Sequence, residues 1–164
     1  ALLGATWIIL KTEGELQRRM QGHAWWLAVG TLGFIGVVSV FTPFQDPEYF
    51  GRWFAMPGVL FSVVMPVALL VTAWLLFTGL NAGRDAQPFL ASLMLFVLCF
   101  IGIGISFYPH IVPPALTIVE AAAPDESLLF ALVGTVILVP MILGYTAYAY
   151  WVFRGKIDPD EGYH

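Results

Sequence analysis

Charged residues are scarce in this 164-residue chain, and they are unevenly spread. They make up 11% of the sequence, against about 25% in ordinary soluble domains, while 59% of the residues are hydrophobic. Four long stretches contain no charge: Ala24–Gln45, Trp53–Gly83, Ala86–Val119 and Ser127–Phe153. A soluble fold of this size has too little interior to bury so much apolar sequence. The sequence therefore predicts an integral membrane protein.

Other scarcities exclude several functional classes. Cys99 is the one cysteine of the sequence, so neither a disulfide framework nor a cysteine metal site is available. Seven Lys and Arg stand against eleven Asp and Glu, which gives a net charge of −4 and no basic patch for nucleic acid. The sequence also contains no glycine-rich phosphate loop and no short catalytic motif.

The first ten residues, Ala1–Leu10, are apolar but too few to cross a membrane. As a helix they span about 15 Å, half of a hydrocarbon core of about 30 Å. They lack the basic start and the small-residue cleavage site of a signal peptide. We therefore expect the last half of a longer helix, in the C-terminal part of a larger subunit.

The uncharged stretches predict an all-α fold, in which residues 1–164 form a single transmembrane domain. Their continuous apolarity favours helices over the alternating strands of a membrane barrel. We expect one partial span followed by four full spans, near residues 24–43, 57–80, 88–108 and 128–153. Within them, the spacing of Gly30, Gly33 and Gly36 predicts close approach of a neighbouring helix, and Pro66 and Pro140 are expected to interrupt helical hydrogen bonding.

The distribution of Lys and Arg predicts the orientation. If Leu10 ends in the cytoplasm, six of the seven cations lie on that side, in Lys11–His23, in Asn81–Gln87 and after Phe153. The opposite loops contain only Arg52. By the positive-inside rule, the C-terminus is expected in the cytoplasm.

Residues at the expected span ends support these boundaries. Pro57 and Pro88 suit the first turn of a helix, where a missing N–H costs nothing. Asp125–Ser127 precede the last predicted helix and can supply its N-cap and negative charge at the positive end of its dipole. Arg154 and Lys156 suit its negative end. Most tryptophans fall toward span ends, as in an interfacial belt: Trp25, Trp26, Trp53, Trp74 and Trp151.

The segment Lys11–Gly22 is the most informative polar stretch. Thr12 and Glu15 have the spacing of a capping box, which predicts a short helix that starts at Thr12 and ends at Gly22. Glu15 and Arg19 lie four residues apart, in the favourable order for an ion pair. This helix is interpreted either as solvated surface or as a face that docks a partner subunit or guides protons.

Candidate cofactor ligands are few and poorly placed. No predicted full span contains Asp, Glu, Lys, Arg or His, which argues against an ion-coupled transport site in this part. The histidines, His23, His110 and His164, lie at or beyond span ends. The deep methionines are expected to be packing residues rather than haem ligands: Met65, Met94 and Met141. We therefore expect no catalytic, cofactor-binding or metal-binding residue.

The longest outer loop contains Pro109, Pro113, Pro114 and Pro124. These prolines bracket Ala115–Ala123, for which we expect a short helix lying at the membrane surface. It is interpreted as a rigid connector, with a lid over a quinone or oxygen route as the alternative.

Three segments give the chain a family resemblance. Gly4–Trp7 with Lys11–Leu16 and Arg18–Arg19, then Tyr108–Pro109, then Val139–Ile157 resemble the C-terminal half of cytochrome bd quinol oxidase subunit II. The resemblance implies a bacterial inner-membrane respiratory complex that oxidises quinol and reduces oxygen to water. It further implies that haems b and d and the quinol site belong to subunit I, which subunit II stabilises, with a small single-helix subunit as a possible further partner. Alternatives are half of a secondary transporter and a purely structural membrane anchor.

Overall fold

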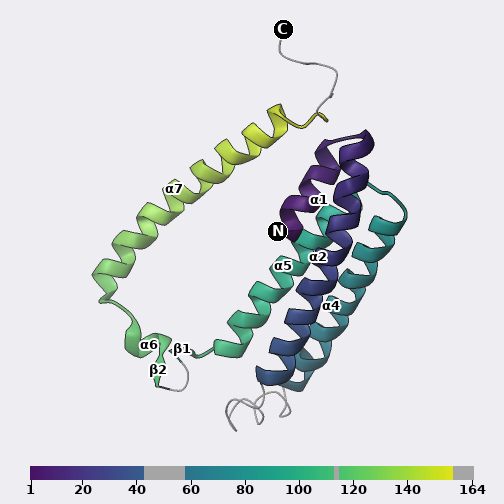
Figure 1. Ribbon diagram of the computed structural model, residues 1–164. Helices are drawn as coiled ribbons and strands as arrows, with labels where there is room; N and C mark the ends of the chain where they lie inside the picture. Colours follow the sequence, from purple (N-terminus) through teal and green to yellow (C-terminus); the bar gives the residue numbers. More distant parts are fainter. Residues whose placement is uncertain (43–57, 113–114, 157–164) are drawn as a thin grey trace. The chain divides into compact units, whose positions relative to one another are not determined.

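The computed structural model describes residues 1–42, 58–112 and 115–156. The chain divides into two units (Figure 1). The first unit comprises Ala1–Ser106 together with the chain from Lys156 onward, and the second comprises Phe107–Gly155. Each unit is described by itself below.

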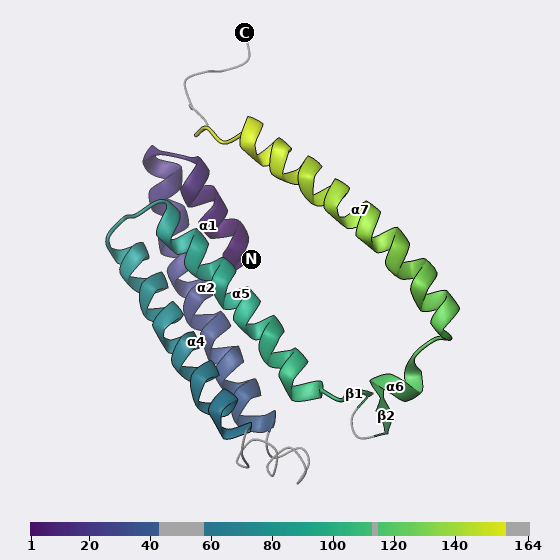
Figure 2. The ribbon, with the colours of Figure 1, turned by 180° about the vertical axis from the view of Figure 1, so that it is seen from behind.

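Helices make up most of the first unit in the described residues. The short helix α1 (Leu2–Lys11) is followed by three long ones, α2 (Gly14–Phe41), α4 (Gly58–Asn81) and α5 (Ala86–Phe107). Both ribbon views show α1 beside the first half of α2, with α4 and α5 alongside (Figures 1 and 2). The predicted all-α fold is confirmed, and Pro66 lies inside α4 as expected.

The second unit combines a small hairpin with one long helix. Strands β1 (His110–Val112) and β2 (Leu116–Thr117) pair antiparallel, and a single turn of helix, α6 (Ile118–Ala121), follows. The last helix is α7 (Asp125–Val152), with Pro140 inside it. Within the described residues, four helices, α2, α4, α5 and α7, are long and apolar enough to cross a membrane. The chain is therefore a multi-pass membrane protein.

The core of the first unit lies at the level of the short helix α1. Buried side chains from all four helices meet there: Leu2, Ala5 and Ile9 from α1, Ala24 and Ala28 from α2, Leu76 and Leu80 from α4, and Ala91 from α5. A hydroxyl pair is buried among them, because Thr6 Oγ1 and Ser92 Oγ lie 2.8 Å apart. Such interhelical hydrogen bonds and small residues are typical of helix packing in membranes.

The glycine stripe does not make the predicted helix contact in the first unit. Gly30, Gly33 and Gly36 are exposed, and a Cβ built on any of them meets no atom within 4 Å. Ala24 and Ala28 pack into the core instead, one turn apart and both fully buried. The reason is the length of α1, which reaches only the first half of α2.

The predicted short helix from Thr12 to Gly22 is also wrong. Thr12 ends α1 with an extended backbone, and its hydroxyl donates to the Ile8 carbonyl at 2.7 Å. Helix α2 begins at Gly14 without a side-chain cap and continues through Gly22 into the membrane span. The Glu15–Arg19 ion pair of the prediction is confirmed. A single glycine inside a helix costs only about 1 kcal/mol relative to alanine. Gly22 therefore does not end α2, which is 28 residues long.

The segment between α5 and α7 corrects two further predictions. Only Ile118–Ala121 of the expected helix Ala115–Ala123 is helical, because Leu116 and Thr117 pair with β1. Pro124, which has no N–H to donate, occupies the N-cap of α7, and no side chain caps that helix. Asp125 and Glu126 do lie in its first turn, where negative charge favours the helix dipole. Pro57 and Trp53 lie outside the described residues, and Pro88 lies in the first turn of α5.

Candidate functional site

A polar junction lies at one end of the first unit and consists of Glu13, Gln17, Asp85 and Lys156. The amide of Gln17 donates to the Ile9 carbonyl at 3.0 Å and to Asp85 Oδ1 at 2.7 Å. Lys156 Nζ lies 2.6 Å from Asp85 Oδ2 and 3.1 Å from Glu13 Oε1. Both oxygens of the Asp85 carboxylate are therefore engaged, each by a different segment of the chain.

The α4–α5 turn that carries Asp85 is shaped by Gly83. Gly83 has a φ of 66°, a conformation that residues with a Cβ rarely adopt. Its N–H donates to the Leu80 carbonyl, and the N–H of Arg84 donates to the Gly79 carbonyl at 3.0 Å. These two bonds form a Schellman motif, which ends α4 and places Asp85 directly before α5.

Gln87 fastens the same turn from the side of α5. Its amide nitrogen donates to the Leu75 carbonyl at 2.8 Å and to Thr78 Oγ1 at 3.1 Å, and its oxygen accepts from Arg84. Gly79 makes room for it, since an added Cβ would lie 3.0 Å from Gln87 Cγ. The ends of α4 and α5 are thus held together by side chains as well as by the turn.

The electrostatics of the polar junction stabilise a protonated lysine. Hydrogen bonds from the ammonium group to Asp85 and Glu13 raise the pKa of Lys156 above its ordinary value. The junction is partly open to solvent, with 35% of the Lys156 side chain and 64% of the Glu13 side chain exposed. Two carboxylates around one ammonium group suit the fastening of chain segments, and the junction contains no nucleophile–base pair.

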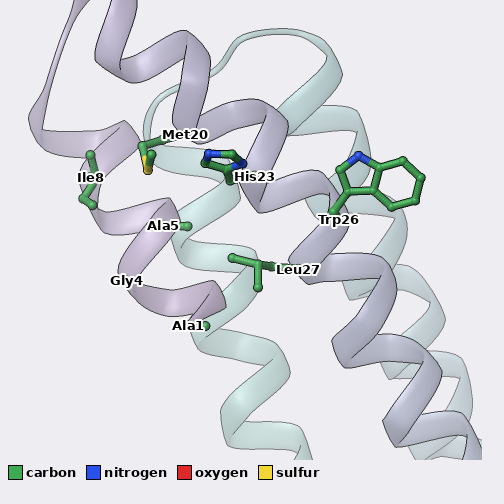
Figure 3. Close-up of a pocket in the computed structure, with 8 residues that line it drawn as sticks. All are labelled: Ala1, Gly4, Ala5, Ile8, Met20, His23, Trp26 and Leu27. Atoms are coloured by element: carbon green, nitrogen blue, oxygen red, sulfur yellow. The ribbon is translucent and has the colours of Figure 1, made fainter.

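An open groove runs between α1 and α2 on the first unit. It encloses about 650 Å³ and is lined by Ala1, Gly4, Ala5, Ile8, Met20, His23, Trp26 and Leu27. Figure 3 shows Met20 and Leu27 directed toward α1, whereas Trp26 extends away from it. His23 is the one titratable side chain in this lining. The groove is therefore an apolar surface with an imidazole at its edge.

The candidate ligands are distributed over different elements. His23 lies exposed on α2, and His110 is partly buried in β1 of the second unit. Met65 lies on α4, Met94 on α5 and Met141 on α7, the last two with more than half of the side chain exposed. His164 lies outside the described residues. Across residues 1–42, 58–112 and 115–156, no group of three or more His, Cys, Asp or Glu could hold a metal ion.

The segment between α5 and α7 contains a capping box, which the sequence analysis expected at Thr12 and Glu15. The N–H and hydroxyl of Thr117 donate to the Glu120 carboxylate at 2.9 and 2.8 Å, and the Glu120 N–H donates back to Thr117 Oγ1. The two hydrogen bonds that the Glu120 carboxylate accepts from Thr117, with the nearby charge of His110, lower the pKa of Glu120 below its ordinary value. The signal was present in the sequence, because Thr117 and Glu120 have the same spacing as Thr12 and Glu15.

Comparison with known proteins identifies the family. The family model described as cytochrome bd terminal oxidase subunit II matches residues 1–153. The chain belongs to this family. The resemblance that the sequence segments indicated is therefore confirmed, and the multi-pass helical fold agrees with it.

Named relatives of this subunit II family member come from Escherichia coli. The chain is 24% identical over 196 aligned residues to the cytochrome bd-I ubiquinol oxidase subunit 2 of strain K12. The same figures hold for the proteins of that name from strains O6:H1 and O157:H7. Each match covers 96% of this chain and 49% of the relative. The chain thus spans about half the length of the curated relatives it matches.

Proposed function

We propose that this chain acts within a bacterial cytochrome bd-type quinol oxidase as part of subunit II and stabilises a haem-bearing subunit I. The observation that carries the proposal is the family match over residues 1–153. The relatives are ubiquinol oxidase subunits by name, which supports quinol oxidation coupled to the reduction of oxygen to water as the activity of the whole complex.

The contribution proposed for this chain is helix packing. Helix α7 has no buried residue, and its large apolar side chains are exposed along its length, among them Phe130, Val136 and Leu143. The second half of α2 is similarly exposed, as at Phe34 and Val38. Helices that are apolar all round require lipid or other helices as neighbours. In the proposed complex these faces contact lipid, subunit I and, as a further candidate, a small single-helix subunit.

No catalytic residue is proposed in this chain. Haems b and d and the quinol are assigned to the partner subunit. His23 and His110 are proposed as interfacial residues, since each lies on a different unit and outside the predicted spans. The methionines on α4, α5 and α7 are proposed as packing residues.

The proposed location is the bacterial inner membrane, with the C-terminus in the cytoplasm. Six of the seven Lys and Arg lie on that side in this orientation. The polar junction supports it, because Glu13, Asp85 and Lys156 come from three segments of the cytoplasmic set and meet at one end of the first unit. The transporter and structural-anchor alternatives are not favoured, since the matching family is an oxidase subunit.

The test is purification of the complex through an affinity tag on this subunit, in mild detergent. We expect a second, haem-bearing polypeptide to co-purify and the preparation to show haem bands in its visible spectrum. In a strain that lacks the haem-bearing partner, the tagged chain should be colourless and recovered in lower yield. A colourless preparation without a second polypeptide from the intact strain would contradict the proposal and favour a structural anchor.

A further inference from the structure

We propose that the C-terminal end of α7 binds the headgroup of an anionic phospholipid, whose phosphate is held by Arg154 on a platform of Trp151 and Tyr148. All three residues belong to the second unit. The inference requires a chain that spans a membrane, and it requires neither the proposed activity nor the proposed orientation.

The length of α7 places this end at the level of the lipid headgroups. The helix runs for 28 residues, which is about 42 Å at 1.5 Å per residue, whereas the hydrocarbon core of a bilayer is about 30 Å thick. Asp125 and Glu126 lie in the first turn, and because charged side chains are costly in hydrocarbon, the core begins near Leu128. About 20 residues then cross the core, which ends near Ala147. Tyr148 and the residues that follow it therefore lie among the headgroups.

Tyr148, Trp151 and Arg154 form one stack, because positions three apart share a helix face. The ring centroids of Tyr148 and Trp151 lie 6.1 Å apart, and the guanidinium carbon of Arg154 lies 4.9 Å from the centroid of the Trp151 ring. Both aromatic residues are exposed, Tyr148 by 62% and Trp151 by 60%. The stack therefore presents an ordered cation at a surface that lipid can reach.

The chemistry of the stack suits a phosphate group. A guanidinium that lies over an aromatic ring keeps its N–H donors available at its edge, and Arg binds phosphate through two parallel N–H···O bonds. Trp and Tyr combine an apolar body with a polar group, which suits the boundary between headgroups and acyl chains. The stack thus combines phosphate donors with rings that can pack against the glycerol and the upper part of an acyl chain.

Charge favours an anionic headgroup over a zwitterionic one. The acidic residues of the second unit, Glu120, Asp125 and Glu126, precede α7 or lie in its first turn, at the opposite end of the helix from Arg154. A zwitterionic lipid brings its own ammonium group, which competes with Arg154 for the phosphate. The negative end of the α7 dipole also lies here, so an anion needs a cation in order to bind.

The test uses photoreactive lipids in the native complex. The purified complex is reconstituted in nanodiscs of phosphatidylcholine that contain a small, equal fraction of photoreactive phosphatidylglycerol or of photoreactive phosphatidylcholine with the same chains. After irradiation, the labelled peptides that contain residues Tyr145–Arg154 are quantified by mass spectrometry. We expect the anionic probe to label this end about fivefold more than the zwitterionic probe, which corresponds to about 1 kcal/mol for one basic side chain at an anionic lipid.

Variants assign this preference to the stack. Arg154→Gln should make labelling by the two probes equal, and Trp151→Leu, which keeps the cation but removes its platform, should lower the preference. Arg19→Gln is the matched control, because Arg19 is an exposed arginine that pairs with Glu15 on a different helix, and it should leave the preference unchanged. Each preparation is first shown to elute as the intact complex in size-exclusion chromatography.

Three results would overturn the proposal. The first is equal labelling of the unchanged chain by the two probes, and the second is a preference that survives Arg154→Gln or Trp151→Leu. The third is the absence of labelling by both probes, which would show that another polypeptide covers this end of α7. None of these readouts uses haem, so the lipid site and the proposed function can fail separately.

Discussion

Replacing Ala28 with leucine is expected to destabilise the first unit and lower the yield of intact complex. Ala28 is fully buried in the cluster where α2 meets its neighbours, so the three added carbons have no free space. Overpacking of this kind costs about 1–3 kcal/mol. The measurement is the fraction of complex that stays monodisperse in size-exclusion chromatography after heating through a temperature series.

The matched control for this change is Ala86→Leu. Ala86 is the first residue of α5 and is exposed, so the same three carbons point into open space. We expect its heating curve to overlay that of the unchanged protein. Equal losses from Ala86→Leu and Ala28→Leu would show that the buried cluster is not where the helices pack.

Truncating Leu76 to alanine is the second change with a large expected effect. Leu76 is fully buried in α4, and its removal leaves a cavity within the core. Leu→Ala changes in soluble cores cost about 2–5 kcal/mol. In a membrane the unfolded helix is surrounded by lipid as apolar as leucine, so the transfer term largely cancels and about 1–3 kcal/mol remains for lost packing.

Leu70→Ala on the same helix is the control for the truncation. Leu70 is 70% exposed, so its side chain contributes little to packing within this unit. Unfolding in increasing concentrations of a denaturing detergent should shift for Leu76→Ala and stay unchanged for Leu70→Ala. A shift of equal size for both variants would contradict the assigned core.

The sequence predicts the spans because uncharged apolar length is a strong signal. Each predicted full span overlaps one of the helices α2, α4, α5 and α7, and the partial span coincides with α1. The positions of Pro66 and Pro140 inside helices and the Glu15–Arg19 pair also follow from local sequence. These features depend on composition and on neighbours within one helical turn.

Contacts between distant segments could not be predicted from the local sequence. A small-residue stripe predicts that a helix can approach, but the length of α1 decides that Ala24 and Ala28, and not Gly30, meet it. The capping-box spacing occurs at Thr12 and at Thr117, and only at Thr117 does the chain leave the residue free to cap a new helix. Which residues of α2 are packed, and which threonine caps a helix, therefore depend on parts of the chain beyond the local motif.

The polar junction was missed for the same reason. The sequence predicts Lys11–His23, Asn81–Gln87 and the segment after Phe153 on one side of the membrane, but no local pattern pairs Lys156 with Asp85. The available signal was that these three segments are predicted on the same side of the membrane, because oppositely charged residues in loops on one side can form ion pairs. Lys156 was instead expected to close the last helix, which ends at Val152.

The central proposal is that this chain packs against a haem-bearing subunit without supplying a ligand to the haem. Reduced-minus-oxidised visible spectra of the purified complex test it most directly, with His23→Ala and His110→Ala compared with the unchanged protein. The account predicts the same haem bands, with the same height per mole of complex, in all three preparations. Loss or displacement of a haem band in either variant would contradict it.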